Sequence, residues 1–102
     1  MDEKQKCLHC AKKTARDAED RKRLMNRLKR IEGQVRGLQN MLEQDSYCAD
    51  ILTQSAAVKA AINAFNRDLL ALHIRGCVAR DIRNGNDAVI DELTEIVQKL
   101  MK

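Results

Sequence analysis

Apolar residues recur along this chain at alternating steps of four and three, the spacing that places side chains on one face of a helix. From about Asp17 to Glu43 the pattern comprises Leu24, Leu28, Ile31, Val35, Leu38 and Leu42. From Ser46 to Asn84 it comprises Ile51, Ser55, Val58, Ile62, Phe65, Leu69, Leu72 and Gly76. From about Asp87 to the end it comprises Val89, Ile90, Leu93, Ile96, Val97, Leu100 and Met101. The pattern predicts three helices, with the longest in the middle.

Polar residues and glycines mark where these helices begin and end. Three acids complement the dipole at the start of the first helix: Asp17, Glu19 and Asp20. Asp45 or Ser46 can cap the second helix, and Asn84-Gly85-Asn86 can close it, since Gly and Asn tolerate the left-handed conformation. Gly33 and Gly37 each cost about 1 kcal/mol inside a helix relative to alanine, which favours close approach of another helix there.

The composition sharpens the fold prediction. A chain of 102 residues with 33% charged and 2% aromatic residues has little to bury as a monomer, so oligomerisation would supply the missing core. Proline is absent and no run alternates with period two, so the predicted class is all-α.

The same composition bears on the compartment. No apolar run reaches about 18 residues, and the first six residues lack the apolar core of a secretion signal. We therefore expect a cytoplasmic protein with no membrane partner. In a reducing compartment, four cysteines indicate metal or redox chemistry better than disulfides.

Three residues of the central helix have metal-binding side chains. His73 and Cys77 stand four residues apart, about 40° around a helix, and can hold one ion. Cys48 lies 25 residues before His73, within about 20° of the same face but about 37 Å away along the axis. One molecule cannot close that site, whereas an antiparallel pair of central helices would bring Cys48 to His73 and Cys77 of the neighbour.

Several motifs resemble the CsoR family of bacterial copper-sensing repressors. They are the run from Asn26 to Gly37, Asp45-Ser46-Tyr47-Cys48 and His73-Ile74-Arg75-Gly76-Cys77, within a match from about Leu24 to Lys102. The wider class includes relatives that sense nickel, formaldehyde or persulfide, and the Cys, His, Cys positions mark its copper branch.

The resemblance implies a helical protomer, an antiparallel bundle dimer and a dimer of dimers that binds operator DNA when copper-free. Binding of Cu(I) at Cys48, His73 and Cys77 would release the DNA and derepress genes of copper efflux or homeostasis. In the family a tyrosine and a glutamate surround the ligands, and Tyr47 and Glu92 occupy similar places here. Expected partners are operator DNA, further copies of the chain and a copper chaperone.

Positive charge is concentrated on the first predicted helix, on the surface opposite its apolar residues. The cations there are Arg21, Lys22, Arg23, Arg27, Lys29, Arg30 and Arg36. They can neutralise several phosphates. The alternative is an ordinary solvated face, and no helix-turn-helix pattern identifies a recognition helix.

Residues 1–17 show no helical pattern, and we predict a flexible tail ahead of a single helical DNA-binding and metal-sensing domain at 18–102. The tail contains Cys7, His9 and Cys10, whose spacing can chelate zinc or copper. Such a site would be auxiliary, and incidental thiols are the alternative.

Two other functions compete with copper sensing. A thiol- or persulfide-responsive repressor would link Cys48 and Cys77 through sulfur, but persulfide-sensing relatives lack the histidine, so His73 favours copper. A small metal carrier would use Cys7, His9 and Cys10. No nucleophile, base and orienting group occur together, so we expect no enzyme.

Overall fold

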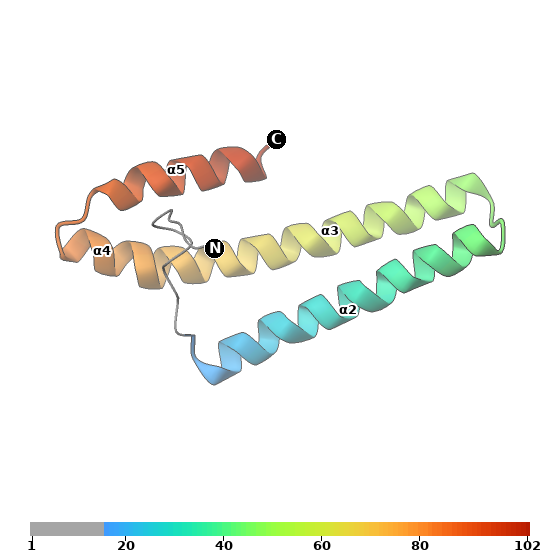
Figure 1. Ribbon diagram of the computed structural model, residues 1–102, viewed down its shortest axis with the longest axis horizontal. Helices are drawn as coiled ribbons and strands as arrows, with labels where there is room; N and C mark the ends of the chain where they lie inside the picture. The colour runs from blue at the N-terminus through green and yellow to red at the C-terminus, as the bar shows by residue number, and fades with distance from the viewer. Residues whose placement is uncertain (1–15) are drawn as a thin grey trace, which may run out of the picture.

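The computed structural model describes residues 16–102, and this part of the chain is all-α. Its elements are α2 (Ala18–Glu43), α3 (Cys48–His73), a π turn (Ile74–Val78), α4 (Ala79–Arg83) and α5 (Ala88–Leu100). α2 and α3 form an antiparallel pair, and α5 folds back along α3 and α4 on the other side (Figure 1). The molecule is elongated, 55 × 29 × 25 Å. The predicted all-α protomer with a long central helix is confirmed.

α2 begins as its sequence predicts. Asp17 is the N-cap residue, and its carboxylate accepts a hydrogen bond of 2.9 Å from the Glu19 backbone N–H. Glu19 and Asp20 lie in the first turn, where their charge complements the unpaired N–H groups.

The turn between α2 and α3 differs from the prediction. Asp45 has a φ of 55°, and the Ser46 N–H donates to the Met41 carbonyl at 2.9 Å, which is the Schellman closure of a helix. Asp45 therefore ends α2 and does not cap α3. The N-cap of α3 is Tyr47, with no side-chain hydrogen bond, so the predicted capping by Asp45 or Ser46 is wrong.

The turn between α4 and α5 uses the same closure. Gly85 has a φ of 81°, and the Asn86 N–H donates to the Asp81 carbonyl at 2.8 Å. The prediction that Asn84-Gly85-Asn86 ends the central helix is confirmed.

The central helix contains an irregularity that its sequence pattern does not predict. Between α3 and α4, residues Ile74–Val78 form a π turn, whose hydrogen bonds span five residues where those of an α-helix span four. Each residue of this wider turn advances less than 100° around the axis. Cys77, which lies in the turn, is therefore rotated back from the offset of 40° that a regular α-helix predicts.

The core of the single chain is thin. Within residues 16–102 the buried apolar side chains are Leu24, Ile31, Val58, Val78 and Val89. Twelve large apolar side chains in the same range are at least 40% exposed, among them Leu28, Val35 and Ile62 from the predicted helix faces. A β-carbon added to Gly33 or Gly37 would meet nothing within 4 Å, so the helix predicted to approach there does not come from the described part of this chain.

The described residues contain no candidate membrane-spanning helix. Across the described residues, none of the helices combines the length and hydropathy that spanning a bilayer requires.

Candidate metal centre and nucleic-acid interface

His73 and Cys77 share one cleft of about 330 Å³ where the π turn leaves α3. His73 is the last residue of α3, and Cys77 is the fourth residue of the turn. Both side chains are half-buried. The rim of the cleft is charged, with contributions from Arg16, Asp17, Asp20, Arg75 and Arg80. The structure therefore brings together the imidazole and one thiol of the predicted ligand set.

The His73 ring has an unsatisfied nitrogen. Its Nε2 atom is buried and has no hydrogen-bond partner among residues 16–102. A buried nitrogen without a partner loses the full free energy of its hydration, so native structures seldom leave one unpaired. A metal ion bound at Nε2 would remove that penalty, and an imidazole paired with a thiolate suits a soft ion such as Cu(I).

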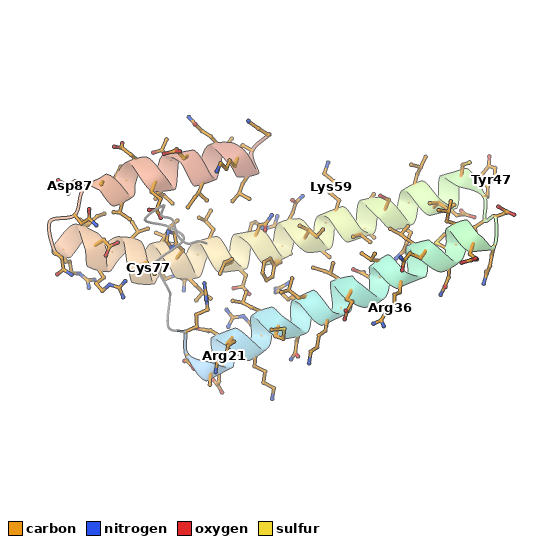
Figure 2. All side chains as sticks on the ribbon, viewed as in Figure 1. Arg21, Arg36, Tyr47, Lys59, Cys77 and Asp87 are labelled. Carbon is orange, nitrogen blue, oxygen red and sulfur yellow. The ribbon has the colours of Figure 1, made fainter. Side chains whose placement is uncertain are left out.

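Cys48 and Tyr47 lie at the other end of α3. Figure 2 shows Tyr47 and Cys77 toward opposite ends of the long axis. Cys48 is exposed, and Tyr47 is 74% exposed. No three His, Cys, Asp or Glu side chains of the described residues come close enough to hold one ion. The predicted separation within one chain is confirmed, and joining Cys48 to His73 and Cys77 requires a second copy.

Glu92 lies apart from the cleft. It is half-buried on α5 and lines a separate shallow pocket together with Glu95, Ile96 and Lys99. Its predicted place around the copper ligands, like that of Tyr47, stays a prediction. Cys7, His9 and Cys10, the predicted auxiliary site, lie outside the described residues.

Lys22 is exposed, and the other six cations of α2 that the sequence analysis names divide into two groups. Arg21, Lys29 and Arg30 are exposed and make no ion pair with the described residues. Arg36 lies 3.7 Å from Glu32, and both side chains are 69% exposed, so this pair restrains Arg36 little. Arg36 lies on the side of α2 away from α3 (Figure 2). These four residues form the outer basic face.

Arg23 and Arg27 are turned toward α3, so placing them with the others opposite the apolar residues is wrong. Arg23 binds Asp68 at 2.9 Å, and Arg27 lies 3.3 Å from the same carboxylate. They project from the edge of α2 that borders α3. Sequence reasoning missed Asp68, although it is the only acidic residue between Asp50 and Asp81. An isolated acid on a helix that packs beside an arginine-rich one is a detectable signal for an ion pair.

Comparison with known proteins identifies the group to which this arrangement belongs. The family described as metal-sensitive transcriptional repressors matches residues 20–99. The copper-sensing transcriptional repressor CsoR of Bacillus subtilis is 46% identical over 88 residues, covering 85% of this chain and 87% of the relative. The copper-sensing repressor RicR of Mycobacterium tuberculosis is 44% identical over 69 residues, covering 68% of this chain and 72% of the relative.

Solved structures agree with the sequence comparison. The Cu(I)-bound copper-sensing repressor CsoR from Geobacillus thermodenitrificans has a TM-score of 0.83 and 42% identity, covering 88% of this chain and 95% of that chain. The nickel-responsive regulator InrS has a TM-score of 0.69 and 30% identity, covering 86% of this chain and 97% of that chain. The likeness extends over nearly the whole described fold.

Proposed function

Because this chain belongs to the family of metal-sensitive transcriptional repressors, we propose that it is a copper-responsive repressor, bound to operator DNA without copper and released by Cu(I). The observation that carries the proposal is that His73 and Cys77 line one cleft, and that the buried Nε2 of His73 has no hydrogen-bond partner among residues 16–102. The relatives are named for copper, which favours this function over a thiol- or persulfide-responsive one. The proposed repressor function includes no catalytic step.

The ligand set that we propose is Cys48 from one subunit with His73 and Cys77 from another. Two thiolates and one imidazole make a soft set with few ligands, which suits Cu(I), whereas nickel prefers more nitrogen and oxygen ligands. Tyr47 would lie at the shared site because it is the neighbour of Cys48 in the chain, and Glu92 would approach the site from α5. An antiparallel pair of subunits would contain two equivalent sites.

Homo-oligomer formation follows from the same family membership and from the thin core. The exposed apolar residues of α2 and α3 would be covered by another copy of the chain. A dimer of dimers is the assembly that we propose. A copper chaperone as the donor of the ion is a further proposal.

The DNA-binding surface that we propose is the basic side of α2. The outer basic face of Arg21, Lys29, Arg30 and Arg36, together with Arg27, supplies cations for phosphate contacts. No helix-turn-helix pattern identifies a recognition helix, and we propose that DNA shape and backbone contacts carry much of the recognition.

Coupling between the two sites has to be conformational. The ligands lie on α3 and the π turn, whereas the cations lie on α2, so ligation at His73 leaves the charge of the basic face unchanged. Drawing Cys48 of one subunit to His73 and Cys77 of another would alter the relative placement of the α2 helices. The fit of their cations to successive phosphates would then change.

Fluorescence anisotropy under anaerobic conditions tests the proposal. The probe is a labelled duplex selected by the copper-free protein from a random-sequence library. One equivalent of Cu(I) per subunit should weaken binding by about 5- to 150-fold, the usual range of allosteric coupling. Unchanged binding after copper loading would contradict the proposal.

A His73→Ala variant supplies the matched control. It should bind the duplex as the unmodified protein does when copper-free, and should respond weakly to Cu(I). Normal release by this variant, with loss of the response on deleting residues 7–10, would place the sensor in the tail.

A further inference from the structure

An ion-pair cluster joins α2 to α3 at the edge of the basic surface. It consists of Asp20, Arg23 and Arg27 on α2 and of Asp68 on α3, five residues before His73. Two guanidinium groups thus share one carboxylate. The Asp68 side chain is 19% exposed, against 47% for Arg23 and 40% for Arg27. The acid lies inside the cluster, and the two arginines lie at its surface.

Arg23 uses all of its guanidinium nitrogens within the cluster. Its Nε donates to Asp68 Oδ2 at 3.0 Å, and its Nη2 donates to Asp68 Oδ1 at 2.9 Å. Its Nη1 donates to Asp20 Oδ1 at 3.0 Å. The fork of two parallel hydrogen bonds fixes the plane of the guanidinium. These bonds engage three of its five N–H groups, and the other two lie beside the negative charges of Asp20 and Asp68, which disfavour a phosphate there.

Arg27 is engaged on one side only. Its Nε is buried and lies 3.3 Å from Asp68 Oδ2, without the alignment of a hydrogen bond. Its two Nη atoms make no ion pair or hydrogen bond with residues 16–102. The carboxylate therefore attracts the inner edge of the guanidinium, and the outer edge stays available to solvent.

We propose that Arg23 and Asp68 are positioning residues, and that they hold Arg27 in the orientation in which its outer edge meets a DNA phosphate. This inference rests on the proposed function. Arg23 anchors the carboxylate, and the carboxylate orients Arg27 before DNA arrives. Fewer rotamers of Arg27 are then lost on binding, which is the advantage of preorganisation.

Salt dependence of DNA binding separates a positioning residue from a phosphate contact. Each phosphate neutralised contributes about 0.9 to the slope of log affinity against log salt. Arg27→Ala should flatten the slope by about 0.9. Arg23→Ala should weaken binding about 5-fold at every salt concentration with an unchanged slope, and Asp68→Asn should likewise weaken it.

Conservative variants test the mechanism. Arg23→Lys should fail to restore affinity, because a single ammonium cannot form the fork to Asp68. Lys59→Ala removes an exposed cation of α3 and controls for overall charge, with no expected change of slope. Circular dichroism verifies folding of each variant. Arg23→Gln, which keeps a hydrogen-bonding side chain, replaces Arg23→Ala if that variant fails to fold.

Failure of the positioning inference can be distinguished from failure of the proposed function. If Arg23→Ala flattens the slope as much as Arg27→Ala, or binds like the unmodified protein, the positioning inference is wrong while copper-sensitive repression stands. Rescue by Arg23→Lys would also overturn it. If the unmodified protein binds no duplex or ignores Cu(I), the proposed function itself fails.

Discussion

The Asp68 carboxylate carries a charge that the surrounding residues stabilise. The fork of hydrogen bonds from Arg23 lowers the pKa of Asp68, and the charges of Arg23 and Arg27 lower it further. In turn, hydrogen bonds to Asp68 and then Asp20 raise the pKa of Arg23. Both shifts favour the ionised pair, so the link between α2 and α3 depends on an ionised Asp68.

The effect of pH on stability follows from the direction of that shift. The pKa of Asp68 is lower in the folded chain than its ordinary value near 3.9. Its contribution is therefore present above about pH 4 and lost as the pH falls through the folded-state pKa. Asp68→Asn should lower the melting temperature at pH 7, and the difference from the unmodified protein should shrink below pH 4. Thermal unfolding by circular dichroism from pH 7 to pH 3 measures this, and a constant difference would show that the charge is not the cause.

The residues of the candidate site differ in how far the sequence predicts them. Cys48, His73 and Cys77 stand out because soft ligands are few and their spacing can be tested against helix geometry. The inward turn of Arg23 and Arg27 could not be predicted in that way. It depends on the rotation of α2 about its axis relative to α3, which side-chain packing between the helices decides.

At the scale of elements, two turns of the same type contain different residues at the critical position. Asp45 and Gly85 both adopt positive φ after a helix, 55° and 81° respectively. This conformation costs an L-residue about 1–2 kcal/mol, whereas glycine adopts it freely. The α2–α3 turn therefore contains backbone strain that the α4–α5 turn avoids.

Exchanging the residue types should shift stability in opposite directions. Asp45→Gly should raise the free energy of unfolding by about 0.5–1 kcal/mol, and Gly85→Ala should lower it by about 1 kcal/mol. No atom lies within 4 Å of a β-carbon built at Gly85, so the loss would arise from the backbone. Urea denaturation provides both values. A destabilising Asp45→Gly would mean that the Asp45 side chain makes a contact in the assembly.

The sequence predicted the helices well and their interruptions poorly. Apolar spacing located α2, α3 with α4, and α5, because that spacing reflects which face is covered. It did not distinguish Asp45 as the end of one helix from Asp45 as the cap of the next, since aspartate suits both roles. The π turn was not predicted because one glycine, Gly76, does not mark an interruption, as Gly33 and Gly37 within the regular helix α2 show.

At the scale of the whole molecule, one chain buries too little to account for its fold. Residues 16–102 contain five buried apolar side chains and twelve large apolar side chains that are exposed. We expect the melting temperature to rise with protein concentration, because association stabilises only the folded state. Light scattering on copper-free protein should give the mass of a dimer or tetramer, and a folded monomer at micromolar concentration would contradict the shared site.

Mixed oligomers test sharing of the ligands between subunits. Subunits carrying Cys48→Ser alone or Cys77→Ser alone should each bind Cu(I) weakly. In a dimer containing one of each, one site loses both thiolates and the other keeps all three ligands. Random 1:1 reassociation makes about half of the dimers mixed, so about a quarter of the tight binding should return on mixing, measured by competition with a Cu(I) chelator. Absence of any recovery would show that the three ligands do not come from two chains.

The exposed Tyr47 has a consequence for spectroscopy. The chain contains one tyrosine and no tryptophan, so its tyrosine fluorescence comes from a single ring at the N-cap of α3. That ring is 74% exposed in the isolated chain and adjoins Cys48. Burial of the ring against another subunit and ligation of the neighbouring sulfur should each change its quantum yield. The unlabelled protein therefore contains its own optical probe of both events, at the residue beside the shared ligand.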